Sequence, residues 1–185
     1  YDGKKGIKVI PCYYKKDYPE WSDRGDGPGA PVAVHLPNSP VISTGKRDGS
    51  KIRLPNGNYL EETASYFVMV ETKTGGFTPA LITMKSTQLN VSKKWNSMMK
   101  TIQIPDGKGG FAIPPMHGVV YNLASTLQKN DKGSWYGWVV TQDRIMGQDD
   151  KALYLSAKEF AGNVSKGSVQ TKADVEEKVS DSTPY

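Results

Sequence analysis

The sequence contains one cysteine, Cys12, and two histidines, His35 and His117. A single cysteine excludes an internal disulfide and any site with several thiolate ligands. Neither histidine lies in an H-x-x-x-H arrangement, so a structural or catalytic zinc site is not expected. We therefore predict no metal and no cofactor, and the lone thiol favours a reducing, intracellular setting.

Long apolar runs are also missing. No stretch approaches the about 18 residues that a membrane-spanning helix needs. The opening residues, YDGKKGIKVI, contain no apolar segment followed by a small-residue cleavage site. The expectation is a protein of the cytoplasm with no membrane partner.

Catalytic signatures are scarce. No P-loop, Gly-x-Ser-x-Gly elbow or Gly-x-Gly-x-x-Gly fingerprint is present. Glu71 and Lys73 have the Glu-x-Lys spacing by which a nuclease carboxylate holds a metal beside a lysine, with Asp48 as the upstream acid. The same spacing also arises when two oppositely charged residues simply share one face of a strand. We therefore predict no catalytic residues and no enzyme, and keep a metal-dependent nuclease as an alternative.

Acidic residues are unevenly distributed. Residues 1–163 carry 21 Lys and Arg against 15 Asp and Glu, whereas residues 164–185 carry three against four. No acid occurs from Thr72 to Pro105, a stretch with five lysines. Such a segment favours a polyanionic partner, and the alternative is a solvated lysine face.

Alternation and turn residues predict a mainly β protein with one or two helices. Strands are expected at residues 7–15, 32–36, 41–45, 65–72, 78–86, 119–128 and 134–145, with Asn56-Gly57 forming a tight primed turn. Residues 17–31 and 105–118 are rich in Gly and Pro and are expected to be loops. A short helix is expected at residues 149–160, after which residues 164–185 form a flexible, weakly acidic tail.

The main helix is predicted over residues 86–102, with Ser86 or Thr87 as its N-cap. Its apolar residues form one stripe: Val91, Trp95, Met98, Met99 and Ile102. The order of strands, helix and final hairpin predicts one domain, residues 1–163, that forms an OB-like five-stranded barrel with a helix between strands 3 and 4. A β-sandwich with one helix would give the same order.

Basic residues interleave with aromatic ones in three places: CYYKKDYPEW, KRDGSKIR and KNDKGSWYGW. Single-stranded nucleic acid suits this combination, since exposed bases stack on rings while lysines and arginines contact phosphates. The predicted binding residues are Tyr13, Tyr14, Lys15, Lys16, Trp21, Lys51, Arg53, Lys132 and Trp135.

Two of these assignments depend on local context. Tyr136, Trp138 and Val140 share one face of the expected strand, and we assign that face to the core because all three are large. Trp135 then lies over Gly137 as a stacking platform, although Gly137 could mark a bend that reverses the two faces. Trp21 is expected in a loop, where it has no core to cover.

The segments LPNGNYLEETASYFVMVETKTGGFTPALITMKSTQLNVSKKWNSMM and NDKGSWYGWVV resemble tailed-bacteriophage single-stranded-DNA-binding proteins. The likeness covers roughly residues 7 to 145. This resemblance implies an OB-type fold and no catalytic residues. It also implies that the protein coats single-stranded DNA during replication or recombination in an infected host cell, with phage proteins of those processes as partners. We expect binding without strong sequence preference, and the alternative from another class is a phage virion or assembly adaptor. The oligomeric state is left open.

Overall fold

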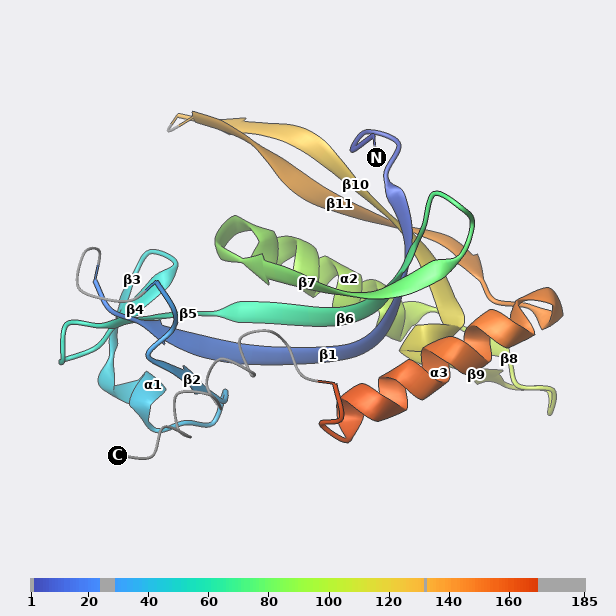
Figure 1. The fold of residues 1–185 in the computed structure, drawn as a ribbon, viewed down its shortest axis with the longest axis horizontal. Helices are drawn as coiled ribbons and strands as arrows, with labels where there is room; N and C mark the ends of the chain where they lie inside the picture. Colours follow the sequence, from blue (N-terminus) through green and yellow to red (C-terminus); the bar gives the residue numbers. More distant parts are fainter. Residues whose placement is uncertain (1, 24–28, 132, 170–185) are drawn as a thin grey trace, which may run out of the picture.

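The structure is a computed structural model that describes residues 2–23, 29–131 and 133–169. Within these residues the chain is mainly β, with a curled antiparallel sheet and three α-helices (Figure 1). The predicted class, mainly β, is confirmed, with one helix more than expected. None of the helices in these ranges is long and apolar enough to cross a membrane.

Five long strands form the main sheet in the order β11-β10-β1-β6-β7, and all neighbours are antiparallel. They are β1 (Ile7–Trp21), β6 (Thr63–Glu71), β7 (Phe77–Lys85), β10 (Val119–Asn130) and β11 (Gly133–Ile145). The register shifts between Pro11 and Tyr13 and between Val120 and Tyr121, and such bulges bend strands. In the described part of the chain β7 and β11 do not pair, so the curled sheet is a half-barrel.

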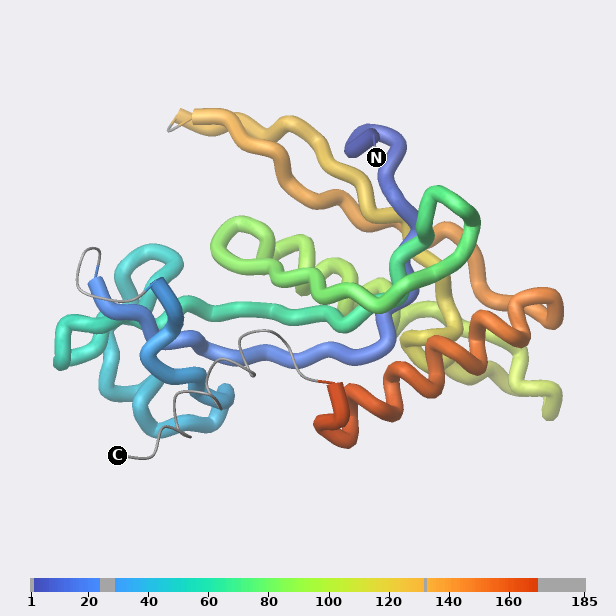
Figure 2. Tube along the Cα trace, in the orientation of Figure 1, coloured from blue at the N-terminus to red at the C-terminus, as the bar shows by residue number. Residues whose placement is uncertain are grey.

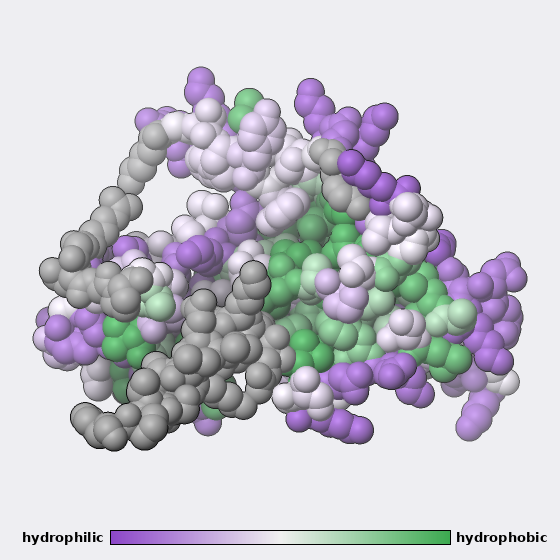
Figure 3. Space-filling view, viewed as in Figure 1, coloured by the Kyte–Doolittle hydropathy of each residue, from purple (hydrophilic) through white to green (hydrophobic). Residues whose placement is uncertain are grey.

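Two helices cover opposite faces of this sheet. α2 (Leu89–Thr101) lies on the concave face, where Trp95 is fully buried and stacks on Tyr66 with ring centroids 4.4 Å apart. α3 (Lys151–Ser165) packs on the other face against Ile10, Cys12 and Met69. In the space-filling view, hydrophobic side chains gather to the right of centre, over the part of the sheet next to α3 (Figure 3).

A small sheet continues the far end of β1. There β1 pairs with β2 (Ala33–His35) and β5 (Tyr59–Glu61), and β5 continues to β4 (Lys51–Arg53) and β3 (Lys46–Asp48). One face of this sheet covers a third group of buried residues, Tyr18, Ile52, Leu54 and Leu60, which packs against α1 (Val41–Thr44). In the sequence, strands β2 to β5 of the small sheet thus lie between β1 and β6.

The prediction of a loop from residue 17 onward is wrong at its start, because β1 runs through Tyr18 and Glu20 to Trp21. Tyr18 and Glu20 are buried while Pro19 and Trp21 are half-buried, and this alternation outweighs the Gly/Pro content. Trp21 therefore lies in a strand. Residues 24–28 of the predicted loop lie outside the described residues.

Residues 41–45 are predicted as a strand, but residues 41–44 form α1 instead, and Gly45 follows it in an extended conformation. Pro40 has helical φ and ψ of −62° and −24°, and a fixed proline φ suits the start of a helix. The Ser43 and Thr44 hydroxyls donate to the carbonyl oxygens of Pro40 and Val41, each at 2.7 Å. Local side-chain bonding thus outweighs the β-branched composition.

The helix at residues 86–102 is confirmed, but its predicted N-cap is wrong. A 3-10 turn, η1 (Ser86–Gln88), precedes α2, Gln88 occupies the cap position, and no side-chain capping bond forms. Ser86 has a positive φ of 52°, which turns the chain out of β7 before the helix begins.

The remaining elements lie close to their predicted places. In the turn between β4 and β5, Gly57 has a φ of 89° but Asn56 does not have a positive φ, so the turn is not the primed type. The predicted loop at residues 105–118 contains short elements. β8 (Ile104–Pro105) pairs with β9 (Phe111–Ala112) in a small hairpin, and η2 (Met116–Gly118) follows. η3 (Gln148–Asp150) leads into α3, which passes the predicted boundary at residue 163. Residues 170–185 of the predicted tail lie outside the described residues.

Candidate nucleic-acid interface

The face of the small sheet that points away from its core brings together three residues predicted from the sequence, Trp21, Lys51 and Arg53, each of them half-buried. Trp21 in β1 pairs with Tyr59 in β5, which pairs with Arg53 in β4. Directly opposed residues on antiparallel strands share a face, so these three side chains form a row across the sheet. Lys51 lies two residues from Arg53 and therefore on the same face.

Cations lie over both rings of this row. The Nζ atom of Lys51 is 3.5 Å from the Tyr59 ring centroid, and the Cζ atom of Arg53 is 5.6 Å from it. Lys85, at the end of β7, places its Nζ 5.9 Å from the Trp21 ring. We call Trp21, Lys51, Arg53, Tyr59 and Lys85 the aromatic–cation surface.

Tyr59 and Lys85 were not among the residues predicted from the sequence. The hairpin register could have identified Tyr59, because a turn centred on residue 56 places it opposite Arg53. Lys85 is 64 positions from Trp21 in the sequence numbering, and only the pairing of β7 with β6 brings its strand end to the small sheet.

Carboxylates balance part of this charge. Glu61 lies 2.8 Å from the Lys85 ammonium, while Asp23 and Asp48 lie 3.2 and 3.4 Å from the Arg53 guanidinium. Hydrogen bonds to Asp23 and Asp48 raise the pKa of Arg53. These carboxylates therefore neutralise part of the positive charge of the aromatic–cation surface.

A buried carboxylate supports the surface from below. Glu20, only 7% exposed, accepts hydrogen bonds from the side-chain amides of Asn58 at 2.6 Å and Asn56 at 3.1 Å, and its Oε2 lies 2.7 Å from His35 Nε2. The Asn58 hydrogen bond is the main cause of the lowered pKa of Glu20. The network joins β1, β2 and the β4–β5 turn, which fixes the strands that carry Trp21 and Tyr59.

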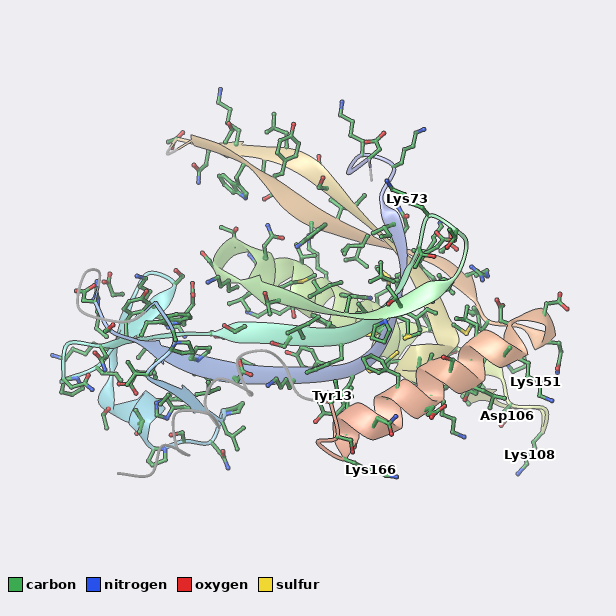
Figure 4. The ribbon with its side chains drawn as sticks, in the orientation of Figure 1. Tyr13, Lys73, Asp106, Lys108, Lys151 and Lys166 are labelled. Atoms are coloured by element: carbon green, nitrogen blue, oxygen red, sulfur yellow. The ribbon has the colours of Figure 1, made fainter. Side chains whose placement is uncertain are left out.

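The predicted residues Tyr13 to Lys16 do not form one cluster. Tyr13 meets Phe67 edge to face at 6.0 Å, and Tyr14 meets Tyr66 at 4.9 Å on the opposite, concave face. Figure 4 labels Tyr13 on β1, away from the small sheet. Lys15 lies 3.3 Å from Asp17 and Lys16 lies 2.7 Å from Glu62, whose hydrogen bond raises the pKa of Lys16.

The assignment of Tyr136 and Trp138 to the core is wrong. Their side chains are 67% and 36% exposed, and only Val140 on that face packs against the core. Figure 2 shows that the β10–β11 hairpin projects away from the rest of the sheet.

Trp135 is half-buried rather than displayed on a cleared surface. The side chain of Gln128 fills the space beside Gly137, 2.5 Å from where a Cβ would lie. Trp135 instead borders a cavity of about 250 Å³ with Thr87 and Ser134. Its indole N–H is buried and has no acceptor among the described residues, and Lys132 lies outside them.

The nuclease residues are separated in space. Asp48 lies in the small sheet beside Arg53, whereas Glu71 ends β6 and Lys73 lies on the β6–β7 turn at the other end of the strand (Figure 4). The described residues contain no group of three or more His, Cys, Asp or Glu side chains that could hold a metal ion. Burial raises the pKa of the Cys12 thiol to about 12, which leaves it unsuited to nucleophilic chemistry.

No curated protein and no solved structure matches the chain. The family model described as Pam3 phage gp34-like protein matches residues 1–170. Because this range spans nearly the whole sequence, the chain is a phage protein that belongs to the Pam3 phage gp34-like family.

Proposed function

We propose that this protein binds single-stranded DNA through the aromatic–cation surface, without strong sequence preference and without catalysis. The observation that carries the proposal is the row Trp21–Tyr59–Arg53, in which two rings lie under three cations. The resemblance to single-stranded-DNA-binding phage proteins and the membership of a phage family support it. DNA replication or recombination in the infected cell is the corresponding setting, with phage proteins of those processes as further partners.

Energetics favour exchange of a cation for a base on these rings. An exposed cation–π contact contributes about 0.5–1 kcal/mol. A base stacked on an aromatic side chain contributes about 1–3 kcal/mol. A base can therefore displace the Lys51 ammonium from the Tyr59 ring, and the lysine is then free to contact the adjacent phosphate.

The fold is consistent with an OB-like barrel, which is part of the proposal. Its long strands follow one another as β1, β6, β7, β10 and β11, with α2 between the third and the fourth. Oligonucleotides bind OB folds on the face of strands 2 and 3 and on the loops after strands 1 and 4. The small sheet takes the place of the first of these loops, and Lys85 ends the third strand.

The test is the affinity of variants for a fluorescent oligo-dT. Tyr59→Ala and Trp21→Ala are each expected to weaken binding about 5- to 150-fold, the loss of one stacking contact. Lys51→Gln is expected to give a smaller loss and keeps both rings. The matched control is Phe111→Ala, which removes a 71% exposed ring on β9 and is expected to bind as the wild type does. Wild-type affinity in all three surface variants would contradict the assignment.

The exposed hairpin favours a second candidate function, that of a virion or assembly adaptor. Leu127, Tyr136 and Trp138 share one face of β10–β11 and remain 36–67% exposed. Exposed aromatic side chains of this kind are common at protein interfaces. An adaptor would form a discrete complex or oligomer on a sizing column and would not bind oligo-dT.

A further inference from the structure

α2 carries an uncompensated row of lysines. Lys93, Lys94 and Lys100 are exposed, and none has a carboxylate within ion-pair distance among the described residues. Two cations of the aromatic–cation surface, Arg53 and Lys85, differ because they are ion-paired. We call Lys93, Lys94 and Lys100 the α2 lysine ridge.

Helical geometry places these lysines on one arc. At 100° per residue, Lys93 and Lys100 differ by about 20° in azimuth and about 10 Å along the axis, and Lys94 lies about 100° away. The exposed polar residues Asn90, Ser97 and Thr101 fill the arc between them. Trp95 and Met99 occupy the opposite, buried side, so the exposed arc presents no ring on which a base could stack.

No acid offsets the ridge from neighbouring positions. The first turn of α2 contains no acidic residue, and no glutamate or aspartate occurs anywhere in residues 72–105. The i±4 neighbours of the three lysines are therefore uncharged, so the helix gains no intrahelical ion pair. A helix face with three free ammonium groups, hydroxyl and amide donors between them, and no ring suits phosphate groups.

We propose that the α2 lysine ridge binds the sugar–phosphate backbone of duplex DNA. Duplex DNA carries about one negative charge per 1.7 Å of axis, so it is the denser polyanion for a surface that uses charge alone. The ridge shares no residue with the aromatic–cation surface, so the two proposed DNA contacts differ: one uses rings and the other uses only charge. This inference goes beyond the proposed single-strand binding and does not depend on the rings.

The test measures duplex affinity of the full chain against salt. A labelled 20-base-pair duplex is titrated between 50 and 200 mM NaCl with wild type and with Lys93→Gln, Lys94→Gln, Lys100→Gln combined. Three lost contacts are expected to reduce the slope of log K against log salt by about 2.7, and to lower affinity at 50 mM by about tenfold or more. Glutamine keeps helix propensity, so α2 is retained.

The matched control removes the same charge elsewhere. Lys108, Lys151 and Lys166 are exposed and lie near α3 and the β8–β9 hairpin (Figure 4), and their combined change to Gln is expected to keep most of the slope. An unchanged slope in the ridge variant, or an equal loss in the control, would overturn the inference, as would a wild type that does not bind duplex at 50 mM salt. Failure to bind oligo-dT would instead contradict the proposed function and leave the ridge unaffected.

Discussion

At the scale of the residue, a single carboxylate holds the small sheet in place. Glu20 receives three polar contacts from β2 and the β4–β5 turn, and its pKa is lowered in the folded protein. Because the folded-state pKa lies below the unfolded one, this stabilisation is complete above the ordinary pKa of about 4.3 and is lost as the pH falls through the folded-state pKa.

The corresponding prediction concerns Glu20→Gln. The variant is expected to lower the free energy of unfolding by about 2 kcal/mol at pH 7, since charge-assisted hydrogen bonds are lost. It is also expected to lose less further stability than the wild type between pH 7 and pH 3. Urea unfolding at several pH values measures both effects, with the exposed Glu159→Gln as the control. Parallel pH curves for wild type and Glu20→Gln would show that this carboxylate is not the acid-sensitive group.

At the scale of the element, Gln88 connects the start of α2 to the edge of β11. The Trp138 amide donates to Gln88 Oε1 at 3.0 Å, across the side of the half-barrel where β7 and β11 do not pair. Gln88→Ala is expected to destabilise the protein by about 1 kcal/mol and to speed hydrogen exchange at the Trp138 amide. Gln103→Ala, at an exposed position, is the control. Slow exchange retained at Trp138 in the Gln88 variant would disprove this connection.

Elements with clear periodicity were predictable from the sequence, and those set by their neighbours were not. α2 was found because burial follows the helical spacing of its stripe, and β6 and β7 were found from their β-branched and aromatic residues, although β6 is buried on both faces. β1 beyond Asp17 was missed because β2 and β5, not local composition, hold it extended. Likewise, the exposure of Tyr136 depends on how far the hairpin extends past the core, which no local pattern encodes.

At the scale of the whole molecule, the small sheet and the hairpin tip lie at the same end, on the left in Figure 1. The sequence predicted Trp21, Lys51 and Arg53 as binding residues, and the fold brings them together. The sequence could not show that Asp23 forms an ion pair with Arg53 and Glu61 with Lys85, because each of these pairs joins segments that are distant in the sequence. The three lysines of the α2 lysine ridge have no such partner among the described residues, which is why we propose different surfaces for stacking and for ionic contacts.

The most direct measurement of the central claim is tryptophan fluorescence of the wild type during titration with oligo-dT at two salt concentrations. We expect quenching that saturates, with an affinity that falls with salt by a slope of about −0.7 per phosphate contact. Trp21→Phe is expected to remove much of the quenching. Absence of any response to oligo-dT at low salt would contradict single-strand binding and favour the virion or assembly adaptor.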